Sequence, residues 1–186
     1  MKMNNLFEKI SLAKKFNDLE VKFGDDLFWD FLEKRIDDSN ILVLLSLGSK
    51  YREFDQKMIN ISPKKLKFQF VSQEPDIRVL DYLCGKLKKL NIETVIAVGG
   101  GSVIDTAKII SLMLSNNIYK CSDLIRFSKE DFLEEKIKVI AVPTTAGTGA
   151  EATPFSTIWD FQKEKKFSCL ASNFSKREII LDPSLT

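Results

Sequence analysis

A short apolar run that ends in three consecutive glycines constrains the fold of this chain more than any other stretch. Val95–Val98 is the kind of apolar run that a parallel sheet buries on both faces. Gly99–Gly101 follows directly, and the absence of Cβ atoms lets the backbone bend sharply and approach a ligand closely. Ser102 then opens an apolar segment of helical periodicity that continues to about Leu114. The order predicts a buried strand, a tight turn and a helix.

The predicted start of this helix has the composition of an anion-binding site. Ser102 and Asp105 have the S-x-x-D spacing of a capping box, so the helix should begin at Ser102. Free backbone N–H groups and the positive end of the helix dipole would then point toward a phosphate. A tight turn without a ligand stays open as the alternative. The motif is not a P-loop, and Ile104 stands where the standard Rossmann fingerprint needs its third glycine.

The rest of the chain alternates between predicted strands and helices. Strands are expected at 41–47, 66–71, 137–142, 155–159, 166–170 and 178–181, after an extended segment at 16–23. Helices are expected at 26–36 with Asp25 as cap, at about 49–59, and from the cap Asp76 to 90; a short helical piece is expected within 116–135. This alternation predicts one mainly parallel, three-layer α/β/α domain over residues 1–186, with ligands at the carboxyl ends of the strands.

Composition excludes several classes of function. The 186 residues include no histidine, which rules out a His-ligated metal site, a Ser–His or Cys–His nucleophile pair and a His acid or base. A net charge of +2 is too balanced to indicate a nucleic acid or a membrane surface as partner. Three scattered cysteines and an N-terminus without signal-peptide or membrane-span character lead us to expect a cytoplasmic protein.

A second glycine loop, Pro143–Glu151, follows a predicted strand just as the first one does. Both loops should therefore open on the same edge of the sheet. Thr144, Thr145 and Thr148 each offer a donor and two lone pairs, which suit ribose hydroxyls, phosphate oxygens or a carboxamide. These threonines could instead tie their own loop together. Beside a phosphate-type turn, the ligand-binding interpretation is favoured.

Together the two loops resemble the iron-containing (group III) alcohol dehydrogenase family. The resemblance rests on 99–108 and 143–151, on the closing residues 179–186, which are similar to the end of that family's N-terminal domain, and on Phe23-Gly24. It implies an N-terminal dinucleotide-binding α/β domain of the dehydroquinate synthase-like kind, followed by an all-helical domain. The expected partners are thus a dinucleotide and, for the parent enzyme, a small alcohol or aldehyde.

The resemblance also implies which residues would bind NADP or NAD. They belong to the glycine turn, the threonine loop and a later lysine: Gly99, Gly100, Gly101, Ser102, Asp105, Thr144, Thr145, Thr148 and Lys166. The glycine turn would hold the pyrophosphate, and the threonines would lie along the cofactor toward the nicotinamide. Lys166 would reach the cofactor ribose, or it would be a solvated lysine in a turn. Asp105 would either contact the cofactor or cap its own helix.

Two departures from the family pattern concern the cofactor. NAD-preferring members carry an acidic residue after the early strand, whereas Ser46–Ser49 has no carboxylate here. NADP(H) should therefore be tolerated, because a carboxylate at that place would repel a 2′-phosphate. Lys50 or Arg52 could help to bind that phosphate, or either could be a surface charge. Asp76 stands near a position where the family often has Asn, which leaves that contact open.

The largest departure concerns the metal. In the family, Fe2+ or Zn2+ is held by one aspartate and three histidines of the helical domain, and this chain ends where that domain would begin. We therefore expect no metal ligands and no catalytic residues of its own, and a cofactor half that is inactive alone. A non-catalytic nucleotide-binding or interaction module and a phosphonate-aldehyde or other specialised aldehyde reductase stay open as alternatives. A homo-oligomer also stays open. The threonine loop argues against dehydroquinate synthase and glycerol-1-phosphate dehydrogenase.

Overall fold

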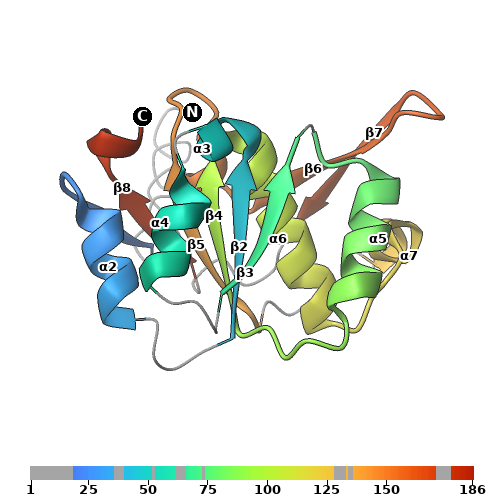
Figure 1. Cartoon of the computed structure of the whole chain (residues 1–186). Helices are drawn as coiled ribbons and strands as arrows, with labels where there is room; N and C mark the ends of the chain where they lie inside the picture. Colours follow the sequence, from blue (N-terminus) through green and yellow to red (C-terminus); the bar gives the residue numbers. More distant parts are fainter. Residues whose placement is uncertain are drawn as a thin grey trace, which may run out of the picture.

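Six parallel strands form the central sheet of the molecule (Figure 1), as the alternation of the sequence predicts. A computed structural model describes residues 19–35, 40–51, 53–61, 66–72, 74–127, 133, 136–170 and 177–186. In order across the sheet the strands are Glu20–Phe23 (β1), Arg177–Leu181 (β8), Lys138–Pro143 (β5), Thr94–Gly99 (β4), Ile41–Ser46 (β2) and Leu66–Val71 (β3). A separate antiparallel hairpin pairs Phe155–Asp160 (β6) with Lys165–Leu170 (β7).

Helices cover both faces of the sheet, which gives the expected three layers (Figure 1). They are Leu27–Arg35 (α2), Leu47–Tyr51 (α3), Phe54–Ile61 (α4), Ile77–Leu87 (α5), Gly101–Ser115 (α6) and Cys121–Phe127 (α7), with 3-10 turns at Ala150–Ala152 (η1) and Pro183–Leu185 (η3). Along β2, Leu42 and Leu44 join the core beneath α5, α6 and α7, whereas Val43 and Leu45 join the core beneath α2 and α4. This alternation explains why the strand is apolar throughout.

Helix α2 is capped by Asp182, near the other end of the sequence, and not by the adjacent Asp25. Helix α2 begins at Leu27, and Asp26 adopts a left-handed φ of 55°. The Asp182 carboxylate accepts the backbone N–H groups of Asp26 at 3.1 Å and Phe28 at 3.0 Å. The predicted cap by Asp25 is therefore wrong, because a carboxylate more than 150 residues away reaches the first turn.

Two further helix predictions need correction. The single helix expected at about 49–59 is two helices, because Glu53, with a φ of 56°, turns the chain between α3 and α4. The helix expected from the cap Asp76 to 90 ends earlier, since α5 ends at Leu87. The predicted cap at Asp76 is confirmed, since its carboxylate accepts the Arg78 N–H. Predictions at 16–18, 36–39, 128–132 and 134–135 lie outside the described residues.

All three cysteines are buried, and none of them forms a disulfide. Burial raises the pKa of the Cys84 thiol to about 12 and also raises that of Cys121, so both thiols are neutral near pH 7. They pack around Met113, at sulfur–sulfur distances of 3.6 and 3.9 Å. These cysteines therefore belong to the core. In the part of the chain that the structure describes, no helix is both long and apolar enough to cross a membrane.

Candidate functional site

The two glycine loops lie side by side at the carboxyl edge of the sheet. Strands β4 and β5 are paired in parallel, and Gly99 stands opposite Pro143, the last residues of the two strands. The Thr144 N–H donates to the Gly99 carbonyl at 3.1 Å, which joins the loops where they leave the sheet. The prediction that both open on one edge is confirmed.

Each glycine of the turn allows a close contact with a neighbouring segment. A Cβ on Gly99 would lie 2.5 Å from Val103 Cγ2, so its absence lets α6 pack against its own strand. A Cβ on Gly100 would lie 2.9 Å from Thr145 Oγ1, and one on Gly101 would lie 3.1 Å from Thr148 Cγ2. The glycines therefore let the threonine loop rest directly on the turn, in addition to leaving the backbone bare.

Helix α6 begins at Gly101, with Gly100 as its N-cap and no capping side chain. The first helical bonds come from Val103 N–H at 3.1 Å and Ile104 N–H at 3.2 Å, both to the Gly100 carbonyl. The predicted capping box of Ser102 and Asp105 is therefore wrong. The N–H groups of Gly101 and Ser102 precede the helical ladder, which is the geometry that binds anions at helix starts.

Asp105 instead joins a buried ion pair that holds the neighbouring strand. Its Oδ2 accepts the Thr157 N–H of β6 at 3.0 Å, and its Oδ1 lies 2.7 Å from Lys108 Nζ. The Lys108 side chain is 1% exposed and also donates to the carbonyls of Ala150 and Phe155. The Asp-x-x-Lys spacing after the glycine turn thus fixes η1 and β6 against α6.

Strand β6 is held along its outer edge at alternate residues. The Phe155 carbonyl accepts from Lys108, the Thr157 N–H donates to Asp105, and the Trp159 N–H donates to the Pro75 carbonyl at 2.8 Å. A parallel bridge between Asp76 and Trp159 adds to this anchor. The hairpin therefore stands at a fixed place beside the glycine turn, although it extends away from the central sheet (Figure 1).

A pocket of about 330 Å³ lies between the glycine turn, the threonine loop and the hairpin. Its lining includes both polar and aromatic side chains: Glu74, Pro75, Gly101, Ser102, Asp105, Thr148, Ala150, Thr153, Phe155, Thr157, Trp159 and Lys166. The side chains of β6 alternate accordingly, because 155, 157 and 159 line the pocket while Ser156 and Ile158 are buried. The volume lies at the lower end of the range of small-molecule and cofactor sites.

The structure brings five of the predicted residues together in this pocket and leaves four beside it. Gly101, Ser102, Asp105, Thr148 and Lys166 line it. The other four contact each other next to the pocket, since Thr144 donates to the Gly99 carbonyl and Thr145 lies against Gly100. At the end of β2, Ser46 Oγ and Ser49 Oγ lie 3.0 Å apart. The Lys50 side chain and Arg52 lie outside the described residues.

Asp76, which follows the pocket residue Pro75, has a carboxyl group that is 1% exposed. Burial alone would raise its pKa, but hydrogen bonds from the Arg78 side chain and backbone outweigh that effect and lower it. It therefore stays ionised at neutral pH and caps α5. Asp76 thus holds the start of α5, and the residue before it, Pro75, lines the pocket. A contact between Asp76 and the cofactor stays open.

Sequence reasoning missed Lys108, Trp159, Phe155 and Glu74. The alternation of β6 could have indicated that 155, 157 and 159 share one face. For Lys108, a lysine three residues after an aspartate on an otherwise apolar helix is the only signal, and it equally fits a surface ion pair.

The described residues do not fit a metal centre. The chain has no histidine, and the part of it that the structure describes holds no group of three or more Cys, Asp or Glu side chains that could bind a metal ion. No chemical step through a metal is derived for this chain.

A family model described as iron-containing alcohol dehydrogenase matches residues 21–183. The aldehyde-alcohol dehydrogenase of Streptococcus pneumoniae is 29% identical over 171 residues, which cover 83% of this chain and 19% of that protein. The phosphonoacetaldehyde reductase of Streptomyces viridochromogenes is 34% identical over 108 residues, 55% of this chain and 27% of that protein.

Solved structures share the fold over most of the chain. An iron-containing alcohol dehydrogenase of Thermococcus thioreducens has a TM-score of 0.77 at 23% identity, covering 90% of this chain and 46% of its own. Sulfoacetaldehyde reductase from Bifidobacterium kashiwanohense, solved in complex with NAD+, has a TM-score of 0.76 at 23% identity, with 91% and 46% covered. The chain thus spans less than half the length of these two enzymes.

Proposed function

We propose that this chain, which belongs to the iron-containing alcohol dehydrogenase family, binds NAD or NADP at the carboxyl edge of its sheet. It would supply the cofactor half of an enzyme that interconverts an alcohol with an aldehyde or ketone. The single observation that carries the proposal is the pocket in which the glycine turn, the threonine loop and Lys166 meet.

Each part of the pocket has a role in this proposal. The N–H groups of Gly101 and Ser102, at the positive end of α6, bind the pyrophosphate oxygens. The Thr148 hydroxyl and the Lys166 ammonium donate to further phosphate or ribose oxygens. The bound dinucleotide supplies the hydride chemistry, and this chain's residues hold it in one orientation. The NAD+ complex of the sulfoacetaldehyde reductase, which has the same fold, supports the assignment.

The end of β2 bears on the choice between NAD and NADP. Residues Ser46–Ser49 carry no carboxylate, and the two serine hydroxyls at their ends contact each other at 3.0 Å. A 2′-phosphate would meet no negative charge in this segment. NADP(H) is therefore bound at least as well as NAD(H) in this proposal.

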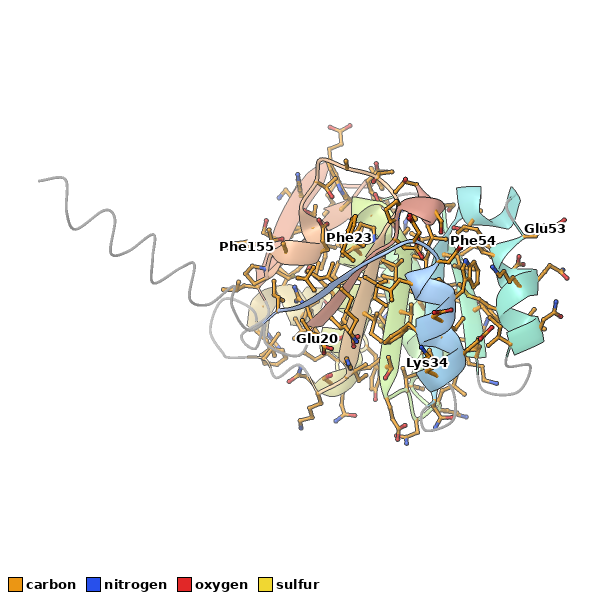
Figure 2. All side chains as sticks on the ribbon, turned by 90° about the vertical axis from the view of Figure 1, so that its left-hand side faces the viewer. Glu20, Phe23, Lys34, Glu53, Phe54 and Phe155 are labelled. Atoms are coloured by element: carbon orange, nitrogen blue, oxygen red, sulfur yellow. The ribbon has the colours of Figure 1, made fainter. Side chains whose placement is uncertain are left out.

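Turnover requires residues that the described chain does not offer. The family's metal would be held by a histidine-containing domain, and this chain has no histidine. Large apolar side chains are exposed, among them Phe23 at 75% and Phe155 at 57% (Figure 2). Their exposure favours a chain that packs against further polypeptide, because a free-standing module would be expected to have a polar surface there.

Calorimetric titration of the chain with NADPH and then NADH, without metal, tests the proposal. Both should bind, with NADPH at least as tight. In Gly100→Asp the new side chain meets Thr145 Oγ1 and adds a negative charge at the helix start, so binding should fall more than tenfold. The matched control is Gly85→Asp, where a Cβ meets nothing within 4 Å and binding should be unchanged. A folded wild-type chain that binds neither cofactor would overturn the proposal.

A specialised aldehyde, including a phosphonate aldehyde, is the second candidate for the substrate of the parent enzyme. The relative named phosphonoacetaldehyde reductase supports it. With NADPH and chelator, the chain alone should reduce neither acetaldehyde nor phosphonoacetaldehyde. Turnover of either would contradict the proposal that this chain supplies only the cofactor half of the enzyme.

A further inference from the structure

Trp159 lies directly opposite Lys166 across the hairpin, and both side chains line the pocket. The Lys166 ammonium is 5.1 Å from the centre of the Trp159 ring. The Phe161 ring stacks on Trp159 with centroids 5.6 Å apart and planes 5° apart. The two rings and the ammonium therefore form one cluster, which restricts the positions that a long lysine side chain can adopt.

The backbone beneath this cluster is fixed. The Trp159 N–H donates to the Pro75 carbonyl at 2.8 Å, two residues after Thr157 donates to Asp105. Because Pro75 is buried and precedes the cap of α5, the ring is anchored to the same frame that carries the pocket wall. The flexible element of the cluster is the lysine, and the tryptophan is its rigid support.

The partner of Lys166 is an aromatic ring and not a carboxylate. Within the described residues, Lys166 forms no ion pair, whereas Lys108 pairs with Asp105 at 2.7 Å. A carboxylate would compete with a phosphate for the ammonium, because its oxygens accept the same hydrogen bonds. An aromatic face attracts the cation without accepting conventional hydrogen bonds, so the N–H donors stay available to an anion.

We propose that Trp159 is a positioning residue, which holds the Lys166 ammonium at the pocket for the phosphate or ribose oxygens of the dinucleotide. The inference rests on the proposed cofactor binding and names the residue that makes Lys166 effective. Trp159 acts through Lys166 in this scheme. Its effect on binding therefore depends on the presence of the lysine.

A double-mutant cycle on NADPH affinity tests this dependence. Lys166→Met should weaken binding about tenfold, the loss of one charge-assisted hydrogen bond. Trp159→Leu should weaken it about three- to fivefold, and Trp159→Phe, which keeps an aromatic face, should lose less. The double variant Trp159→Leu/Lys166→Met should bind no more weakly than Lys166→Met alone. If the affinity losses of the two single variants multiplied in the double variant, the inference would be overturned, because Trp159 would then act on the cofactor independently of Lys166.

Tryptophan fluorescence gives a readout that a purely structural role would not change. The chain has two tryptophans, and Trp29, which belongs to α2, is buried against Phe28 and Phe54 in the core on the other face of the sheet. In Trp29→Phe the emission comes from Trp159 alone. Adding Lys166→Met should change that emission before any cofactor is present, and NADPH should quench it. An unchanged spectrum on removal of the lysine would overturn the inference even if Trp159→Leu failed to fold.

The outcomes separate the two proposals. A folded wild-type chain that binds neither NADPH nor NADH would overturn the proposed function, and this inference with it. Two outcomes would overturn this inference alone, with NADPH still bound by the wild-type chain. In one, the affinity losses of the single variants multiply in the double variant; in the other, Lys166→Met leaves the Trp159 emission unchanged.

Discussion

The pocket has two sides, and each carries a lysine in a different state. On the α6 side, Lys108 is 1% exposed and is surrounded by Asp105 and the carbonyls of Ala150 and Phe155. On the hairpin side, Lys166 is exposed and lies over the Trp159 ring. The same side chain therefore serves as an internal cross-link in one place and as an available cation in the other. Burial and the kind of partner decide the difference.

The difference indicates how the pocket is built. On the α6 side, the pair of Asp105 and Lys108 fixes the position of η1 and β6, and the Lys108 ammonium is too deeply buried to meet a ligand. The hairpin side is held in place by the bonds from Asp105 and Lys108 to β6, and its exposed Lys166 ammonium lies at the pocket. Loss of the buried Lys108 should therefore reduce stability, whereas loss of the exposed Lys166 should affect binding.

The largest effect is expected for Lys108→Met. The substitution leaves the Asp105 carboxylate, 17% exposed, without its cation and removes the Lys108 hydrogen bonds from the carbonyls of Ala150 and Phe155. Removing one partner of a buried ion pair costs about 3–5 kcal/mol of unfolding free energy. Urea unfolding measures this loss. A loss as small as that of Lys166→Met would show that the two lysines do not differ as described.

Gly99→Ala should cost about 1–3 kcal/mol, because the new Cβ would lie 2.5 Å from Val103 Cγ2 in a packed turn. Its matched control is Gly85→Ala on α5, where a Cβ meets nothing within 4 Å. There the gain in helix propensity should stabilise the chain by about 0.5–1 kcal/mol. Thermal unfolding of the two variants should thus shift in opposite directions, and a shared direction would contradict the packing role of Gly99.

Asp76→Asn tests the anchor of the hairpin side. Asparagine keeps an oxygen that can cap the helix but loses the negative charge that pairs with Arg78 and faces the helix start, which should cost about 1 kcal/mol at pH 7. Because the pKa of Asp76 is lowered from its ordinary value of 3.8, its contribution is present above that value and is lost as the pH falls through the folded-state pKa.

Urea unfolding between pH 7 and pH 3 measures this dependence. The difference between wild type and Asp76→Asn should shrink toward acid. Asp123→Asn, in the exposed pair with Arg126 on α7, is the control and should change the stability by less than about 0.5 kcal/mol throughout. A difference that grows toward acid would contradict the direction of the Asp76 pKa.

The smallest effect on stability is expected for Lys166→Met, within about 0.5 kcal/mol, since an exposed cation over an aromatic ring contributes little to folding. The same variant should flatten the salt dependence of NADPH binding, because one screened charge–phosphate interaction is gone. Calorimetric titration at two salt concentrations measures the slope. An unaltered slope would indicate that Lys166 does not meet the anionic part of the cofactor.

Much of the fold could be predicted because its signals are local. Apolar runs gave β2, β4 and β5, and the turn residues between them gave the alternation of strands and helices. Errors occurred where a distant residue replaced a local one. Asp182 caps α2 in place of Asp25, and Asp105 binds β6 instead of capping its own helix. A carboxylate near a helix start looks the same in sequence whichever N–H groups it reaches.

The candidate site was predictable to the extent that it lies on the loops that carry the motifs. Gly101, Ser102, Thr148 and Lys166 were expected, and they meet in one pocket. Trp159 was not expected, because its role depends on a register across the hairpin and on a backbone bond to Pro75, far away in the sequence.

The sequence by itself determined the parallel α/β class, the two glycine loops on one sheet edge and the exclusion of histidine chemistry. These follow from periodicity, from the absence of Cβ atoms and from composition. Only the tertiary structure decided which lysine is buried, which carboxylate caps which helix and which ring faces the pocket. Each of these depends on contacts between segments far apart in the chain, and the free energy of a buried charge is set by the groups that surround it and not by its neighbours in sequence.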